Sequence, residues 1–362
     1  MAAEGDNDYF APYRKANFSQ ASGMRECFDH FDSDGDGLLD AEEFGKLCAS
    51  LFIRNHGGRY QLTEEQVIDL IEQLDENKDG KISLQEFKAC WRYWFKQILS
   101  PVSALIIIDV QNDFISGSLA LKHCPSGQDA EEVVPVINKL LDEVNFDVVV
   151  YTRDWHPADH ISFAENAKHR EMDHSSLVSS EDAKLFDVVR FAGPPVTEQK
   201  LWPTHCVQNS VGAEYHKDLK IVDNSFNISK GSHSNIDSYS AFWDNMKLSQ
   251  TPLAKELGKR NVTDVYLCGL AFDICVSFTS IDAAEHGFRT TVIEDACRSV
   301  DCTDALKMKN KMKEAGCVIV NSQHVSKSIK QVPDMVNVND RRPDLGYQAA
   351  INVAVAKKII NA

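Results

Sequence analysis

The sequence predicts an α/β fold, in which a parallel sheet carries helices on both faces, preceded by a smaller all-α domain. From about residue 102 onward, short β-rich runs alternate with helical stretches, and this alternation is typical of a parallel sheet. The runs are continuously apolar, as expected of strands that are buried on both sides. Before residue 100, helical patterns instead flank two acidic loops. The length of 362 residues also favours two domains.

Five β-rich runs form the predicted sheet. They are SALIIID (103–109), FDVVVYT (146–152), VTDVYLCGL (262–270), TTVIED (290–295) and GCVIVN (316–321). Helical stretches lie between them, such as 130–144 and 274–287.

Three parts of the chain are expected. They are an all-α domain over 1–100, the α/β domain over 101–325, and a C-terminal extension over 326–362 whose apolar spacing predicts a packed helix. Ser100-Pro101 is the predicted linker, because a residue before proline disfavours the helical region.

Charge and cysteine usage limit the partners and the compartment. The net charge of −16 argues against nucleic acid and anionic membranes as partners. The first residues lack the basic and apolar parts of a signal peptide, and no apolar run approaches the ~20 residues that span a bilayer. Ten cysteines without a dense framework indicate reduced thiols, so we expect a cytoplasmic protein. A homo-oligomer is left open.

Two segments in the N-terminal part match the calcium-loop pattern. Calcium takes about six to eight oxygen ligands, a glycine permits the sharp turn, and a final glutamate closes the shell with both oxygens. The first loop offers Asp32, Asp34, Asp36, the carbonyl of Leu38, and Glu43; the second offers Asp75, Asn77, Asp79, the carbonyl of Lys81, and Glu86. Residues 20–98 therefore resemble an EF-hand pair. We interpret the aromatic side chains of the last helix mainly as filling of its core.

A second set of polar residues lies at or just after the β-rich runs and in turn-rich loops. Its members are Asp109, Asp154, His156, His205, Lys230 and Cys275. In an open α/β sheet, the carboxyl ends of the strands converge on one crevice, so separate loops can build one site. Lys230 lies in the turn-rich stretch 227–235, where a loop is expected. Cys275 opens a helix-like run, so the helix end and a nearby lysine are expected to favour its thiolate. The set holds a thiol nucleophile, a carboxylate base, a lysine and an Asp/His/His group. This inventory indicates hydrolysis of a carbon–nitrogen bond through a covalent thioester.

The Asp/His/His group predicts a transition-metal site. Asp154 and His156 are two residues apart, so their side chains point the same way in extended backbone. His205 adds a second imidazole and leaves positions open for water or substrate. Zinc fits these ligands, and iron(II) or manganese also remains open. His160 is left outside the predicted ligand set, and His169 and His174 are interpreted as solvated loop residues.

Residues 101–322 resemble the cysteine-hydrolase family that includes isochorismatase and nicotinamidase, and are most similar to the nicotinamidases because the metal motif is present. The EF-hand pair in front resembles certain animal members. The resemblance implies a catalytic triad of Asp109, Lys230 and Cys275, and metal ligands Asp154, His156 and His205. It also implies that Phe114, Trp202 and Tyr239 hold a pyridine ring. A cis peptide would join Leu270 to Ala271, and the backbone N–H groups of Ala271 and Cys275 would form the oxyanion hole.

These expectations lead to a nicotinamidase that converts nicotinamide and water into nicotinate and ammonia, and so feeds NAD salvage. Two alternatives remain open at this level. One is a related amide hydrolase with another substrate, and the other is a calcium sensor with an inactive hydrolase-like domain. The metal ligands argue against the first, and the intact Asp, Lys and Cys argue against the second.

Overall fold

The computed structural model describes residues 9–10, 22–51, 62–91, 95, 99 and 102–325. They fall into two units, one built from the described residues up to Val102 with the segment 285–289, and one built from 103–284 and 290–325. The predicted linker Ser100-Pro101 and the C-terminal extension 326–362 lie outside the described residues.

The N-terminal unit consists of two helix–loop–helix halves. The first half is α2 (Ser22–Phe31), β1 (Leu38–Leu39) and α3 (Ala41–Leu51); the second is α4 (Glu64–Leu74), β2 (Ile82–Ser83) and α5 (Leu84–Cys90). The short strands pair antiparallel and join the two loops, with Leu39 opposite Ile82. Helix α4 begins with the reciprocal hydrogen bonds of a capping box between Thr63 and Gln66.

Aromatic side chains fill the interior of this unit. Phe28 and Phe87 lie edge to face at 5.3 Å between ring centroids, and Phe87 lies 5.3 Å from Phe95. Trp91 and Phe95 are both buried in the same apolar cluster. The sequence-based interpretation is therefore confirmed for these two residues, which fill the small core.

The C-terminal unit is built on a six-stranded sheet. In spatial order its strands are β10 (Val318–Val320), β9 (Arg289–Arg298), β8 (Asp264–Leu270), β3 (Ser103–Ile108), β4 (Val148–Asp154) and β7 (Phe226–Lys230). The pairs of β3 with β4 and β8, and of β4 with β7, are parallel. Every residue of β3 and β8 is buried, as the continuous apolar runs predict.

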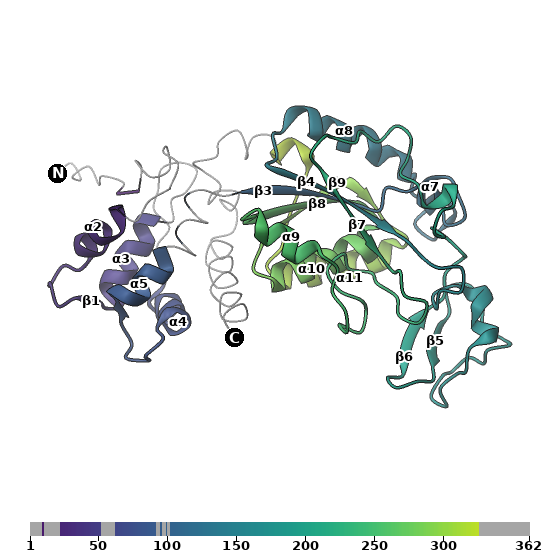
Figure 1. Cartoon of the computed structure of the whole chain (residues 1–362), viewed down its shortest axis with the longest axis horizontal. Helices are drawn as coiled ribbons and strands as arrows, with labels where there is room; N and C mark the ends of the chain where they lie inside the picture. The colour runs from purple at the N-terminus through teal and green to yellow at the C-terminus, as the bar shows by residue number, and fades with distance from the viewer. Residues whose placement is uncertain are drawn as a thin grey trace. The chain divides into compact units, whose positions relative to one another are not determined.

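Helices lie on both faces of this sheet. In Figure 1, α8 (Val133–Glu143) lies above it, whereas α9 (Leu253–Lys259) and α10 (Ser277–Glu285) lie below it. Helix α11 (Cys302–Glu314) follows β9. None of the helices in the described part of the chain is long and apolar enough to cross a bilayer.

The chain order makes the centre of the sheet a switch point. From β3 the chain builds outward to β4 and β7, and it then returns to the other side of β3 with β8, β9 and β10. Loops that leave the carboxyl ends of β3 and β8 therefore diverge and open a crevice between them.

Two strand features differ from the sequence-based expectation. The stretch that contains Lys230 was expected to be a turn-rich loop, but Phe226–Lys230 forms the edge strand β7. The run FNISK is short and half polar because it pairs on one side only, which hides the strand signal. The second feature is a hairpin of β5 (Val188–Phe191) and β6 (Thr197–Lys200), which extends away from the sheet in Figure 1.

Candidate active site

The carboxyl ends of four neighbouring strands carry the candidate catalytic residues. Asp109 follows β3, Asp154 ends β4, and Lys230 ends β7. Cys275 lies in the π-helical turn Phe272–Val276 that connects β8 to α10. The parallel pairing places these residues at one edge of the sheet, as the sequence predicts.

Lys230 is the centre of this group. Its side chain is buried, and Nζ lies 3.2 Å from Cys275 Sγ and 3.0 Å from Asp109 Oδ2. Nζ also donates to the carbonyl of Ser238 at 3.0 Å and to Asp154 Oδ1 at 2.5 Å. A buried ammonium needs such partners, because burial alone would favour the neutral amine. The two carboxylates keep the pKa of Lys230 well above its ordinary value despite burial.

Asp109 has the environment of a general base. Thr152 Oγ1 donates to its Oδ1 at 2.6 Å, whereas Oδ2 is paired with the ammonium of Lys230 at 3.0 Å. Its carboxylate and the thiol of Cys275 lie within 4.8 Å of each other. Burial, together with the negative charge of Asp154, raises the pKa of Asp109, although Lys230 opposes this rise. A carboxylate with a raised pKa accepts and returns a proton more readily near neutral pH.

The thiol of Cys275 differs from the sequence-based expectation. A position before a helix next to a lysine was expected to favour the thiolate. Instead, burial raises the pKa of Cys275 well above its ordinary value, and the lysine offsets this only in part. Burial is the largest cause of this rise; among the charges, Lys230 lowers the pKa of the thiol, whereas the carboxylates of Asp109 and Asp154 raise it.

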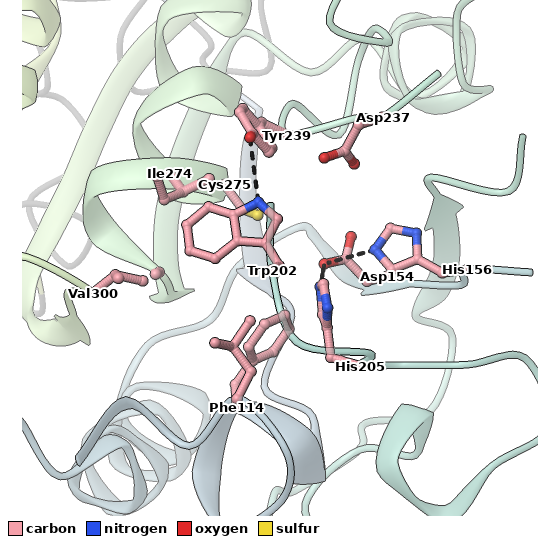
Figure 2. Close-up of a pocket in the computed structure, with 12 residues that line it drawn as sticks. Phe114, Asp154, His156, Trp202, His205, Asp237, Tyr239, Ile274, Cys275 and Val300 are labelled. Atoms are coloured by element: carbon pink, nitrogen blue, oxygen red, sulfur yellow. Dashed lines mark hydrogen bonds and ion pairs between the residues drawn. The ribbon is translucent and has the colours of Figure 1, made fainter. Parts of the chain in front are cut away.

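Asp154, His156 and His205 form a cluster beside this group. His156 Nδ1 lies 2.8 Å from the carbonyl oxygen of Gly231, and His205 Nδ1 lies 2.8 Å from that of Pro203. Each carbonyl accepts from an Nδ1–H group, so the neutral ring keeps a lone pair on Nε2. Burial opposes protonation of His156, but the carboxylate of Asp154 raises its pKa. The two Nε2 atoms face Asp154 Oδ2 at 3.6 and 3.8 Å (Figure 2).

This convergence of acceptor atoms fits a cation. Three lone-pair atoms lie within 4.8 Å of one another, and backbone carbonyls fix both imidazoles from behind, as in metal sites. Burial and the neighbouring His156 lower the pKa of His205 to about 4, which keeps this imidazole neutral. Burial opposes ionisation of Asp154, but Lys230 and His156 hold its pKa well below the usual range.

His160 lies beside the cluster, although the sequence did not predict it as a metal ligand. It is fully buried, its ring stacks on that of His156 with 4.0 Å between centroids, and its Nδ1 lies 2.7 Å from Ser162 Oγ. Its Nε2 has no hydrogen-bond partner among the described residues and lies 4.0 Å from Asp237. The signal in the sequence is a third polar residue at short spacing, D-x-H-x3-H, within one loop. His169 and His174 are exposed, as expected.

A pocket opens over Cys275 and the cluster. Phe114, Trp202 and Tyr239 all line it, and Trp202 Nε1 donates to Tyr239 Oη at 3.4 Å (Figure 2). Further lining residues that the sequence reasoning did not single out for the pocket are Leu119, Asp237, Ile274 and Val300. These come from loops between strands, where no periodic pattern marks a side chain as facing a cavity. Ala271 also lines the pocket, and the peptide bond from Leu270 to Ala271 is cis.

Comparison with known proteins agrees with this geometry. Residues 103–324 match the isochorismatase domain, which covers more than half of the chain. The chain belongs to the isochorismatase family. Residues 21–92 match the EF-hand domain pair.

Among members of the isochorismatase family, the nicotinamidases are similar in sequence and structure. The nicotinamidase of Acinetobacter baylyi is 40% identical over 205 residues, which cover 56% of this chain and 85% of that protein. A nicotinamidase/pyrazinamidase structure from Acinetobacter baumanii has a TM-score of 0.52 and 38% identity, and the match covers 61% of this chain and 96% of that one. The yeast nicotinamidase bound to the inhibitor nicotinaldehyde has a TM-score of 0.50 and 31% identity, with coverage of 61% and 100%.

The two acidic loops fold as paired turns in front of the isochorismatase domain in the sequence. Gly37 and Gly80 have φ values of 82° and 80°, a conformation that glycine adopts at little cost. The carboxylates of Asp32, Asp34 and Asp36 lie within 4.8 Å of one another, and Asp32 Oδ1 has no partner among the described residues.

Each loop is closed by its final glutamate. Glu43 accepts from the backbone N–H of Ser33 at 2.7 Å, and Glu86 accepts from that of Glu76 at 2.8 Å. Both glutamates therefore lie against the start of their loops, as closure of a calcium shell requires.

Proposed function

We propose that the protein is a nicotinamidase, which hydrolyses nicotinamide to nicotinate and ammonia. The observation that carries this proposal is the contact of Lys230 with both Cys275 and Asp109 at the base of a pocket lined by aromatic rings. A thiol, a base and a cation in contact are the inventory for covalent attack on a carboxamide. The similarity to nicotinamidases supports the choice of substrate.

The proposed reaction begins with transfer of the thiol proton of Cys275 to Asp109. The sulfur then attacks the carboxamide carbon, and the backbone N–H groups of Ala271 and Cys275 hold the oxyanion, worth ~3–4 kcal/mol for one donor in comparable sites. Asp109 returns the proton to the leaving nitrogen, and ammonia departs. Water attacks the thioester while Asp109 takes its proton, and nicotinate is released with the thiol restored.

Lys230 compensates negative charge through this cycle. Its ammonium lies against the sulfur and both carboxylates, so it stabilises the thiolate as the proton leaves. Phe114, Trp202 and Tyr239 are proposed to hold the pyridine ring.

The proposed metal ligands are Asp154, His156 and His205. A divalent cation bound there would add positive charge beside the sulfur and would offer an open coordination position to the ring nitrogen of the substrate. Zinc fits two neutral imidazoles and one carboxylate. Iron(II) and manganese fit the same donors, so metal analysis is needed to choose among them.

The EF-hand pair is proposed to bind two calcium ions. Its ligands are proposed to be Asp32, Asp34, Asp36, the Leu38 carbonyl and Glu43 in one loop, and Asp75, Asn77, Asp79, the Lys81 carbonyl and Glu86 in the other. We propose a mainly structural role for calcium in this unit.

We also propose a cytoplasmic location. Each of the ten cysteines lies within the described residues, and none forms a disulfide, which supports a reducing compartment.

The test is release of ammonia by purified protein from a panel of amides. Nicotinamide and pyrazinamide carry a ring nitrogen that can reach a metal, whereas benzamide has the same ring size without it. We expect turnover of nicotinamide and at least a tenfold lower kcat/KM for benzamide. Turnover of aliphatic amides or ureas in preference to nicotinamide would contradict the proposal.

A further inference from the structure

Gln111 connects the segment after β3 to the metal cluster. Its side chain is fully buried, and Oε1 accepts from the backbone N–H of Asp154 at 2.8 Å. Nε2 donates to the carbonyl of the same residue at 2.9 Å, and to the carbonyl of Ala213 at 3.0 Å. One amide therefore holds both backbone polar groups of Asp154, which fixes the direction in which its carboxylate leaves the strand.

Asp113, two residues after Gln111, holds the backbone next to His156 and His205, the two histidines of the cluster. Its Oδ2 accepts from the backbone N–H of Cys206 at 2.7 Å, and its Oδ1 accepts from Ser118 N at 3.1 Å. Cys206 has a φ of 46°, and its carbonyl accepts from the backbone N–H of His156 at 3.0 Å. Because Cys206 also follows His205 directly, this one residue touches the backbones of both histidines.

Two glycines make room for the Asp113 carboxylate. A Cβ atom added to Gly117 or to Gly212 would collide with its oxygens. Gly212 lies in the short helix Val211–Ala213, far along the chain from Asp113. A side chain at either position would push the carboxylate away from Cys206.

We infer that Gln111 and Asp113 are positioning residues for the metal site, through the backbones of Asp154 and Cys206. This inference rests on the proposed function, because it concerns the ligands assigned there. The segment 109–113 thus carries the base Asp109 and also sets the spacing of Asp154, His156 and His205.

The test measures Zn²⁺ affinity of the full chain by chelator competition in excess calcium, together with nicotinamide turnover. Gln111→Met and Asp113→Ala should each weaken Zn²⁺ binding about 10–100-fold, as loss of an outer hydrogen bond does in metal sites. Asp113→Asn keeps an oxygen for the Cys206 N–H and should recover most of the affinity.

A double-mutant cycle separates positioning from general damage. Gly212→Ala should weaken Zn²⁺ binding in the unchanged background but add little in the Asp113→Ala background, because the displaced carboxylate is already absent. Additive losses would contradict the inference.

Asp147→Ala is the matched control. Asp147 also accepts from a backbone N–H, that of Ser103 at 2.7 Å, but at the amino ends of β3 and β4. The Asp147→Ala substitution should lower the free energy of unfolding and leave Zn²⁺ affinity unchanged.

The outcomes separate this inference from the proposed function. Unchanged Zn²⁺ affinity in Gln111→Met and Asp113→Ala overturns the inference alone. Tight Zn²⁺ binding with no nicotinamide turnover by the unchanged protein overturns the proposed function alone. Absence of Zn²⁺ binding by the unchanged protein overturns the inference and the proposed metal site together.

Discussion

Asp154 contacts Lys230 through one carboxylate oxygen and faces the metal cluster with the other. Its Oδ1 lies 2.5 Å from Lys230 Nζ, whereas its Oδ2 faces the Nε2 atoms of His156 and His205. The carboxylate of Asp154 therefore contacts Lys230, the cation beside Cys275, and also faces the proposed metal site. A substitution at Asp154 should alter both the surroundings of the thiol and the binding of metal.

Asp154→Asn should separate these two roles. The amide oxygen can still coordinate weakly, so metal affinity should fall by about tenfold, less than in His205→Ala. The ion pair with Lys230 is lost in full, so kcat should stay low even when added Zn²⁺ saturates the site. Elemental analysis and kinetics at saturating Zn²⁺ check this. Full recovery of kcat by metal would show that the contact with Lys230 is catalytically unimportant.

Cys275→Ala should abolish turnover while the fold and the metal content stay intact, because no other thiol contacts Lys230 among the described residues. Nicotinamide hydrolysis and metal content of the purified variant are measured together. Cys268→Ala is the control, since Cys268 is buried within β8 and lines no part of the pocket. Substantial activity in Cys275→Ala would exclude it as the nucleophile.

Protonation of His205 should destabilise the metal-free protein in mild acid. Burial lowers its pKa to about 4, whereas an unfolded chain has a histidine pKa of about 6.5. Between these values only the unfolded state binds the proton, so stability falls as the pH drops from about 6.5 to about 4. The loss has an upper limit of about 3 kcal/mol.

Urea unfolding at pH 7 and pH 5 measures this effect. His205→Gln should reduce the difference between the two pH values, and His174→Gln should leave it unchanged, because the His174 side chain is 95% exposed. Equal pH dependence in His205→Gln and the unchanged protein would contradict the assignment.

Glu43→Gln together with Glu86→Gln should remove calcium binding, for which we expect a Kd of about 10⁻⁵ M or below in the unchanged protein. The unfolding temperature in calcium should fall, since a ligand that binds only the folded state stabilises it. Calorimetry and nicotinamidase assays check this, with the exposed Glu42→Gln as control. Loss of most activity in a variant whose hydrolase unit remains folded would indicate regulation by calcium instead of a structural role.

The sequence by itself determined those features whose signal is local. Continuous apolar runs predict β3, β4, β8, β9 and β10, because strands of a parallel sheet that is covered on both faces are rich in apolar residues. The calcium loops are equally local, since all ligands of one ion lie within twelve consecutive positions. Phe114, Trp202 and Tyr239 were reached only through the family resemblance, and the structure places all three at the pocket.

Only the tertiary structure decided the features that depend on distant segments meeting. Lys230 looked like a loop residue, because β7 gains its hydrogen bonds from β4 and shows little pattern of its own. The raised pKa of Cys275 depends mainly on its burial, which only the folded chain defines, and the charges of Asp109 and Asp154, far away in the chain, raise it further. The positioning roles proposed for Gln111 and Asp113 could not be predicted from the sequence either, since their partners lie about 40 and 90 residues further along the chain. Electrostatic and hydrogen-bonding energies act through space, so these roles arise only when the sheet has brought the segments together.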